Sequence, residues 1–204
     1  MMDSIGQLFV LSGPSGVGKS SVREGVRKKL PGLAYSISYT TRKPRRGETK
    51  DQDYHFVSLD TFLAMKAAGA FVECAQVHGN FYGTSREQLT KQLNEQREVL
   101  LEIDVQGARQ VKDHFPASCF IFVLPPDRKT LEKRLSERGT EEGKDIEARL
   151  DNASRELEEA SWYDYLIVND VLEEAVEALT AIILSTRFRR QAVLPRVRNL
   201  LKLD

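Results

Sequence analysis

Apolar runs alternate with stretches of helical periodicity along most of the chain. Four near-continuous apolar runs, typical of parallel strands buried on both faces, lie at 8–13, 99–105, 119–125 and 165–170. Amphipathic patterns predict helices at 19–29, 105–114, 127–138, 145–161 and 172–190. Because strands that alternate with helices form right-handed crossovers, we expect an α/β fold, a three-layer sandwich with a parallel sheet between helices.

Two stretches interrupt this alternation. Residues 35–57 and 71–85 alternate polar with apolar residues and carry turn formers. They predict an antiparallel-rich lobe inserted into the sandwich, with a helix near 60–68 inside it, and a capping box at 85–88 predicts a further helix that ends near Asn94. The polar segment 137–145 holds two glycines and predicts an exposed, mobile excursion. We therefore expect a single domain, 1–204, made of a core (1–34 and 95–204), a lobe (about 35–85) and a lid (about 138–145).

Composition narrows the class of protein. The chain has 204 residues, 41% hydrophobic and 29% charged, which suits one soluble domain with a sizeable core. Its 30 basic and 30 acidic residues cancel, which argues against a nucleic-acid binder with a basic surface throughout, although not against local clusters of arginine. Cys74 and Cys119 lack metal-ligand spacing and are expected to be buried thiols. No secretory signal or membrane-length apolar run is visible, so we expect a cytoplasmic protein without a membrane partner.

The segment from Gly13 to Ser20 reads GPSGVGKS and matches the phosphate-binding pattern G-x-x-x-x-G-K-[ST]. It follows a predicted strand and opens a predicted helix, the context that this motif needs. Glycines let the backbone curl so that its N–H groups surround a phosphate chain, and the helix N-terminus adds its dipole. Lys19 would reach the β- and γ-phosphates, and the Ser20 hydroxyl would hold Mg²⁺. A glycine-rich turn with only a structural role is the alternative.

A second acidic element lies at the end of the next predicted strand. Glu102 and Asp104 lie at the end of the apolar run and fall on the same side because side chains alternate along a strand. In parallel sheets, ligands bind beyond the carboxyl ends of the strands. One or both carboxylates would therefore lie near the magnesium or the phosphate acceptor, although strand-end acids that only face water remain the alternative.

The predicted lobe carries a basic cluster. Arg42, Lys43, Arg45 and Arg46 fall within five positions, and the same lobe holds Tyr54 and Tyr82. Such a cluster is often only a solvated face. Guanidinium groups also bind phosphate bidentately, with tyrosine hydroxyls as further donors, so a phosphate monoester on the acceptor would fit.

The same lobe supplies a polar set suited to a purine base. Glu73, Thr84 and Ser38 offer one carboxylate and two hydroxyls. Guanine presents N–H donors at N1 and N2, which a carboxylate accepts, whereas adenine would set an acceptor against that carboxylate. Spacing alone does not decide the base.

Several motifs, in order, resemble those of the guanylate kinase family from about Gln7 to Arg187. They are SGPSGVGKS, TTRKPRRGE, DYHFV, GNFYGTS, EIDVQGA, ERGT and YLIVND. The resemblance implies a P-loop fold with a GMP-binding lobe and a lid, and transfer of the γ-phosphate of MgATP to GMP. It implies an ATP site at Gly13, Pro14, Ser15, Gly16, Val17, Gly18, Lys19, Ser20 and Asn169.

The resemblance also assigns the acceptor site and the lid. GMP-phosphate contacts fall on Arg42, Arg45, Tyr54 and Tyr82, and guanine contacts on Ser38, Glu73 and Thr84. Glu48, Glu102 and Asp104 join the acceptor pocket, with Glu102 at a position where some members have Asp. The implied catalytic residues are Lys19 and Arg42, with Arg134, Arg138 and Arg149 from the lid.

The sequence also leaves other functions open. A kinase for another nucleoside monophosphate or a sugar phosphate would share the phosphate loop, and so would a general NTPase. Guanylate-kinase-like domains that bind phosphopeptides form another class, but their phosphate loop is typically degraded, whereas Gly13, Gly18, Lys19 and Ser20 are all present here. The basic tail 185–204 extends the last helix, packs on another copy in a possible homo-oligomer, or binds nucleic acid weakly.

Overall fold

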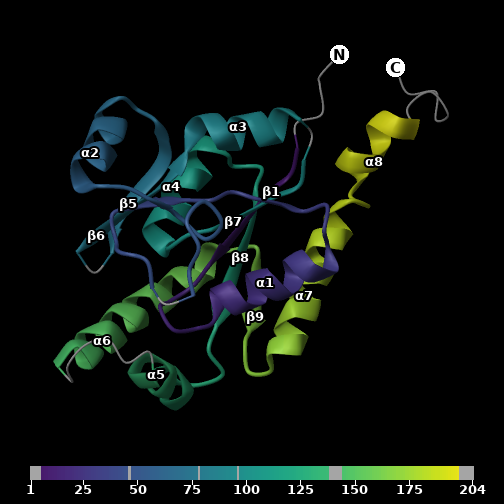
Figure 1. Ribbon diagram of the computed structural model, residues 1–204. Helices are drawn as coiled ribbons and strands as arrows, with labels where there is room; N and C mark the ends of the chain where they lie inside the picture. The colour runs from purple at the N-terminus through teal and green to yellow at the C-terminus, as the bar shows by residue number, and fades with distance from the viewer. Residues whose placement is uncertain (1–5, 46, 78, 96, 138–143, 198–204) are drawn as a thin grey trace.

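The computed structural model describes residues 6–45, 47–77, 79–95, 97–137 and 144–197 (Figure 1). In that part of the chain the central sheet has five parallel strands in the order β2-β7-β1-β8-β9. Their bounds are Leu8–Ser12 (β1), Ala34–Tyr35 (β2), Val99–Glu102 (β7), Cys119–Leu124 (β8) and Tyr165–Val168 (β9). The four apolar runs thus form one parallel sheet, as predicted, and Ala34–Tyr35 adds a short edge strand.

Helices cover both faces of this sheet. Along β1, Phe9 and Leu11 belong to one core cluster, and Leu8 and Val10 belong to the other, because successive side chains of a strand point to opposite faces. Residues of α1 and α7 belong to the first cluster, and residues of α3 and α4 belong to the second. The helices are Lys19–Lys29 (α1), Arg86–Asn94 (α3), Val105–His114 (α4) and Leu172–Thr186 (α7). The three-layer prediction is confirmed.

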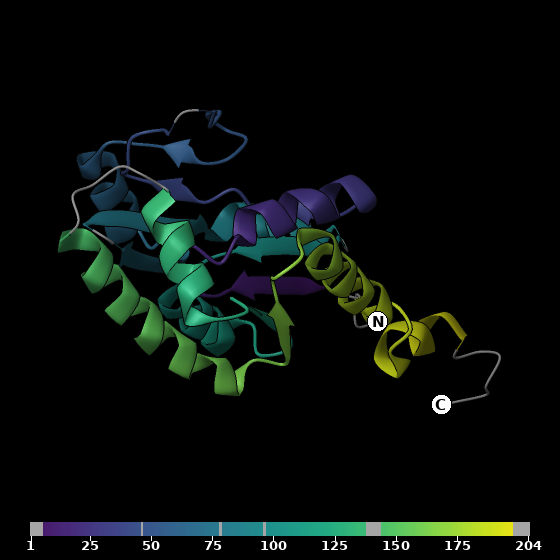
Figure 2. The same cartoon turned by 90° about the horizontal axis from the view of Figure 1, so that it is seen from below.

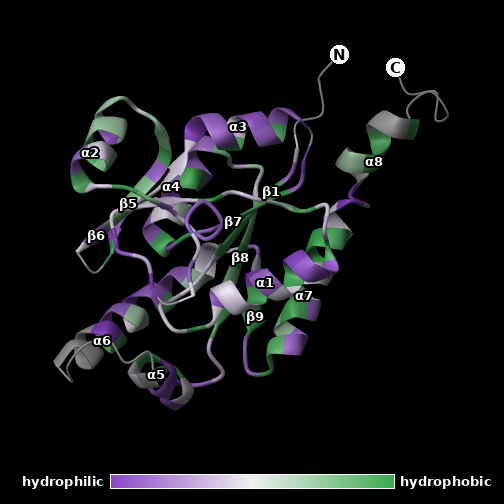
Figure 3. Cartoon of the chain, in the orientation of Figure 1, coloured by the Kyte–Doolittle hydropathy of each residue, from purple (hydrophilic) through white to green (hydrophobic). Residues whose placement is uncertain are grey.

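Hydropathy follows the same layers. Figure 3 shows hydrophobic residues along the central strands and hydrophilic ones over much of α3 and of α6 (Lys144–Glu158). No helix in the described ranges is both long and apolar enough to cross a membrane.

Residues of the inserted lobe form a second sheet in the order β4-β3-β6-β5. Strand β6 pairs antiparallel with β3 and β5, whereas β3 and β4 run parallel. The elements are Tyr39–Thr40 (β3), His55–Phe56 (β4), Leu59–Ala67 (α2), Phe71–Val77 (β5) and Asn80–Ser85 (β6). Phe62 of α2 stacks on Phe71 of β5 with ring centroids 4.6 Å apart, which fastens the helix to its sheet. Figure 2 shows this lobe at one end of the molecule and α8 (Arg190–Val197) at the other.

The remaining helices differ from the sequence prediction mainly at their ends. Helix α5 spans Arg128–Glu137, and α6 is followed by a 3-10 turn at Glu159–Trp162. The predicted helix at 172–190 ends at Thr186 and is followed by α8. Of the predicted lid, 138–143 lie outside the described residues, and Lys144 and Asp145 already belong to α6.

Candidate active site

The phosphate loop joins the carboxyl end of β1 to α1. Gly18 caps the helix at φ +88°, and a Cβ there would lie 2.5 Å from Asn169 Nδ2. Only glycine adopts this conformation without strain and leaves room for the asparagine. Asn169 Nδ2 in turn donates to Val17 O at 2.7 Å, and the Val17 side chain is buried in the core. The segment after β9 therefore holds the loop in place.

Lys19 and Ser20 lie at the first turn of α1, as the motif predicts. Lys19 Nζ donates to the loop carbonyls Gly13 O (2.6 Å) and Pro14 O (3.1 Å). Ser20 Oγ donates to Oε1 of Glu102, the last residue of β7, at 2.8 Å. Two predicted site residues, the loop serine and the strand-end acid, are thus in direct contact.

A buried arginine on α1 binds this acid. Arg23 is 4% exposed, and its Nη1 lies 3.2 Å from Glu102 Oε2 and donates to Tyr35 Oη at 2.8 Å. Its Nη2 reaches Glu24 at 2.7 Å and Asp53 at 3.5 Å. Burial alone would lower the pKa of Arg23, but its acidic and phenolic neighbours more than offset this and raise it. The sequence did not single out Arg23, although it lies four residues after Lys19 and so on the same helical face.

The predicted phosphate contacts of the lobe gather around Arg42. Its two terminal nitrogens donate to the Glu48 carboxylate at 2.7 and 2.8 Å, and its guanidinium carbon lies 5.1 Å from the Tyr54 ring centroid. Glu48 also accepts from the Arg45 N–H at 2.7 Å. Burial opposes ionisation of Glu48, but these hydrogen bonds lower its pKa. Glu48 therefore orients Arg42 and the Arg45 backbone, and the Tyr54 and Tyr82 rings meet edge to face beside them.

The predicted base-binding set lies deeper. Glu73 is 2% exposed, and its Oε1 accepts from the fully buried Thr84 hydroxyl at 2.5 Å. Burial raises the pKa of Glu73 to about 8, against the Thr84 hydrogen bond, and the charge of Asp104 adds to the rise. Ser38 Oγ is buried with no hydrogen-bond partner among the described residues. These groups offer a carboxylate and hydroxyls to a ligand that carries N–H donors.

Asp104 lies at the start of α4, where Oδ1 accepts from the Gly107 N–H at 2.8 Å. Burial raises the pKa of Asp104, against that hydrogen bond and the charge of Lys19. Within the described ranges, its Oδ2 is buried without a partner. Gly107 matters for a second reason, because a Cβ there would lie 2.6 Å from Glu73 Oε2. Both acids are therefore packed against the first turn of α4.

One cavity joins the loop to the lobe. It is lined by residues of both, among them Gly13, Pro14, Ser15, Gly16, Gly18, Lys19, Ser20, Ser38, Arg42, Arg45, Tyr54, Glu73, Tyr82, Glu102, Asp104 and Glu156. The structure thus places most predicted site residues around a single space. Glu156, on α6, lines it without having been predicted, because it stands in an acidic stretch (RELEE) where nothing in the local pattern selects it.

The predicted lid arginines fall into three situations. Arg134 on α5 donates to Asn169 O at 2.9 Å and lines a neighbouring cavity with Gly16, Gly18 and Asn169. Arg149 lies on α6 and is partly buried. Arg138 lies outside the described residues.

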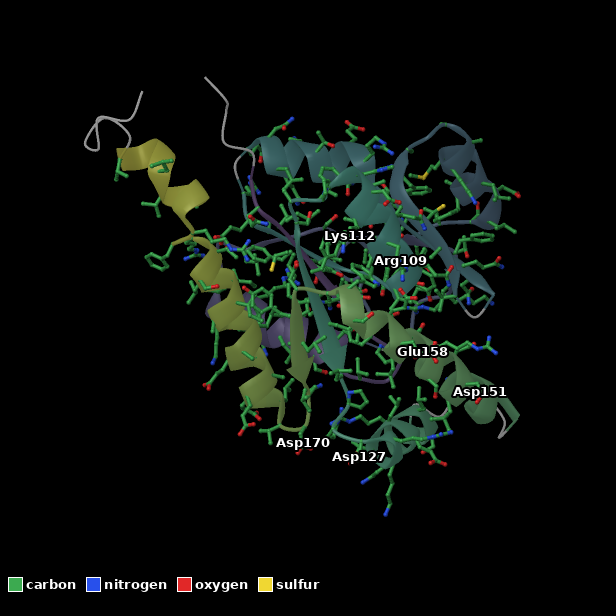
Figure 4. All side chains as sticks on the ribbon, turned by 180° about the vertical axis from the view of Figure 1, so that it is seen from behind. Arg109, Lys112, Asp127, Asp151, Glu158 and Asp170 are labelled. Atoms are coloured by element: carbon green, nitrogen blue, oxygen red, sulfur yellow. The ribbon has the colours of Figure 1, made fainter. Side chains whose placement is uncertain are left out.

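Figure 4 shows Asp127 and Asp170 beyond the ends of β8 and β9, at the edge of the sheet where α5 lies.

The oxygen groups near the loop suit a hard cation. Ser20, Glu102 and Asp104 supply a hydroxyl and carboxylates, and the Asp104 Oδ2 atom is buried and unpaired among the described residues. In the described part of the chain, no group of three or more His, Cys, Asp or Glu forms a metal cage. Mg²⁺ typically takes one or two carboxylates together with substrate phosphates, which fits this set.

Comparisons with known proteins identify the family of the chain. The family model described as guanylate kinase matches residues 5–186. A guanylate kinase of Thiobacillus denitrificans is 48% identical over 193 residues, covering 95% of this chain and 92% of the relative. One from Syntrophotalea carbinolica is 46% identical over 199 residues, covering 98% and 95%. The crystal structure of guanylate kinase from Anaplasma phagocytophilum superposes with a TM-score of 0.75 at 31% identity, covering 95% of this chain and 96% of that one. The chain belongs to the guanylate kinase family.

Proposed function

We propose that this chain transfers the γ-phosphate of ATP to GMP, giving ADP and GDP, with the residues around the shared cavity in the roles described below. The observation that carries the proposal is that the phosphate loop, Arg42, Arg45 and the buried Glu73 carboxylate all line one cavity. A donor phosphate, an acceptor phosphate and a guanine base each find a suitable group there.

The donor would bind the loop. The segment Gly13–Ser20, apart from Pro14, supplies N–H groups to the phosphates, and Lys19 exchanges the loop carbonyls for phosphate oxygens. Asn169 fixes the loop through Val17 O, and the cavity beside Arg134 would take the nucleoside. When bound, Mg²⁺ would neutralise charge on the phosphate chain, and Ser20, Glu102 and Asp104 are the groups that would hold it.

The acceptor would bind the lobe. Arg42, held by Glu48, and Arg45 would pair with the GMP phosphate, and the Tyr54 and Tyr82 hydroxyls would add hydrogen bonds. Glu73 in its ionised form would accept from guanine N1–H and N2–H, with Thr84 and Ser38 beside it. Adenine would place an acceptor against that carboxylate and leave it unpaired in a buried site.

Transfer would then depend on positioning and charge neutralisation. An oxygen of the GMP phosphate attacks the γ-phosphorus in line, the bond to the β–γ bridging oxygen breaks, and ADP leaves with that electron pair. The acceptor phosphate is largely ionised near neutral pH, so the step needs no strong general base. Lys19, Arg134, Arg138 and Arg149 would stabilise the transferring group and the departing ADP.

An acceptor panel tests this function. ADP release from ATP is measured with GMP, AMP, CMP and UMP in turn, and we expect GMP to be preferred by about four orders of magnitude in kcat/KM over AMP. In Glu73→Gln, the ratio of the GMP and AMP values should fall by about 100-fold or more, because the buried acceptor charge is lost. Equal rates with AMP and GMP in the unaltered protein would overturn the proposal, and an unchanged ratio in the variant would remove Glu73 from base recognition.

A further inference from the structure

Glu156 reaches the phosphate loop from a helix far along the chain. The Ser15 N–H donates to Glu156 Oε2 at 3.3 Å, and both residues line the shared cavity with Lys19 and Asp104. The N–H groups of such a loop are the ones that surround the donor phosphates. A carboxylate oxygen hydrogen-bonded to Ser15 N–H therefore lies where a phosphate oxygen would bind.

Electrostatic repulsion prevents the Glu156 carboxylate and a triphosphate from binding the Ser15 N–H at the same time. Burial raises the pKa of Glu156, the positive charge of Lys19 lowers it, and the charge of Asp104 raises it again. A triphosphate would bring several negative charges against the same N–H group. Because like charges at contact distance repel strongly in a partly buried site, the carboxylate has to leave before the phosphate binds.

We propose that Glu156 is a positioning residue that competes with the donor phosphates for the Ser15 N–H, so that ATP binding displaces Glu156 and frees α6 from the loop. This inference rests on the proposed function, since it assumes that the loop binds ATP. It adds a role for α6 in the donor site, beyond the arginines assigned to the lid.

The spacing on α6 gives this displacement a consequence. Arg149 lies seven residues before Glu156, and seven residues are close to two helical turns, so both side chains project from the same face. While Glu156 holds the loop, that face of α6 is fixed against Ser15. Once a phosphate takes the N–H group, the Glu156 contact no longer fixes this face, and a shift of α6 would bring Arg149 toward the donor.

The test is the affinity of the donor site, measured by calorimetry with a non-hydrolysable ATP analogue and Mg²⁺. In Glu156→Gln the Kd of the analogue should fall about three- to tenfold, since a neutral amide is a weaker acceptor than a carboxylate and does not repel the phosphates. The Kd of GMP serves as a second readout, because a general structural defect would weaken both ligands. The matched control is Glu158→Gln, an exposed charge on the same helix (Figure 4), which should leave both Kd values unchanged.

A shorter acid separates contact from charge. Glu156→Asp keeps the negative charge but loses one methylene, so it should not reach Ser15 N–H, and we expect it to tighten the analogue, although less than Gln does, because its charge still repels the phosphates. If the analogue Kd of Glu156→Gln is unchanged or weaker, or if Glu156→Asp matches the unaltered protein, Glu156 does not compete for the loop. Either result, obtained while GMP remains the preferred acceptor, overturns this inference and leaves the proposed function standing.

Discussion

At the scale of single residues, the buried Glu73 carboxylate links base recognition to pH. Its pKa is raised to about 8 by burial, from an ordinary value of 4.5. The folded protein therefore binds a proton that the unfolded chain releases above about pH 4.5. Because the folded state holds more protons in this window, Glu73 lowers the stability of the fold as pH rises from about 4.5 to 8. The site keeps this carboxylate at a cost in stability.

We expect Glu73→Gln to remove this pH dependence. The free energy of unfolding of the variant, relative to the unaltered protein, should increase by up to about 1.4 kcal/mol per pH unit between pH 5 and 8, and then level off. Denaturant titrations at several pH values measure the difference. A difference that stays constant over this range would mean that Glu73 is ionised throughout.

Gly107 is the second residue whose identity the site requires. A Cβ at this position would lie 2.6 Å from Glu73 Oε2 and 3.2 Å from Asp104 Oδ1. We expect Gly107→Ala to displace the Glu73 carboxylate and to weaken GMP binding by at least tenfold, a loss on the order of one buried hydrogen bond to a charged group. Alanine favours a helix over glycine, so the helix itself should not suffer.

The control for this prediction is Gly32→Ala, since Gly32 has nothing within 4 Å of an added Cβ. GMP Kd values measured by calorimetry should be unchanged in the control. Normal GMP affinity in Gly107→Ala would show that Glu73 moves without loss, and would weaken its assignment to the base.

At the scale of elements, Arg23 connects three parts of the fold. From α1 it contacts Glu102 at the end of β7, Tyr35 in β2 and Asp53 in the inserted lobe. Glu102 in turn accepts a hydrogen bond from Ser20 of the loop. The loop, the sheet and the lobe therefore share one ion cluster, with the buried Arg23 at its centre.

Arg23→Met should destabilise the protein by about 3–5 kcal/mol, because it leaves the buried Glu102 carboxylate without its cation. Arg27→Met, one turn later on the exposed part of α1, is the matched control and should change stability by less than about 1 kcal/mol. Denaturant unfolding measures both. Similar small effects in the two variants would mean that water, and not Arg23, solvates Glu102.

Patterns within a few residues predicted the elements well. The apolar runs at 8–13 and 119–125 became β1 and β8, and the glycines before Lys19 predicted the loop, since strand and loop signals are local. The ends of helices were predicted less accurately: the helix predicted at 172–190 stops at Thr186, where the turn to α8 begins. Arg23, Gly107 and Glu156 were missed because their partners Glu102, Glu73 and Ser15 lie far away in sequence, so that only the fold brings them together.

At the scale of the whole molecule, the sandwich and the lobe face each other across the cavity. Two anionic substrates have to meet there while water is kept out, and closure of the lobe onto the sandwich would serve both needs. Solution scattering with GMP and a non-hydrolysable ATP analogue together should therefore give a smaller radius of gyration than scattering without nucleotides. Identical profiles would contradict closure. Scattering with GMP alone, and with the analogue alone, measures how much each ligand contributes to closure.

The central claim is that the lobe holds the acceptor with its phosphate toward the loop. A crystal structure of the complex with GMP tests it most directly. We predict the GMP phosphate within hydrogen-bond distance of Arg42 and Arg45, and the guanine N1–H and N2–H on the Glu73 carboxylate. A GMP molecule bound away from these three residues would contradict the account.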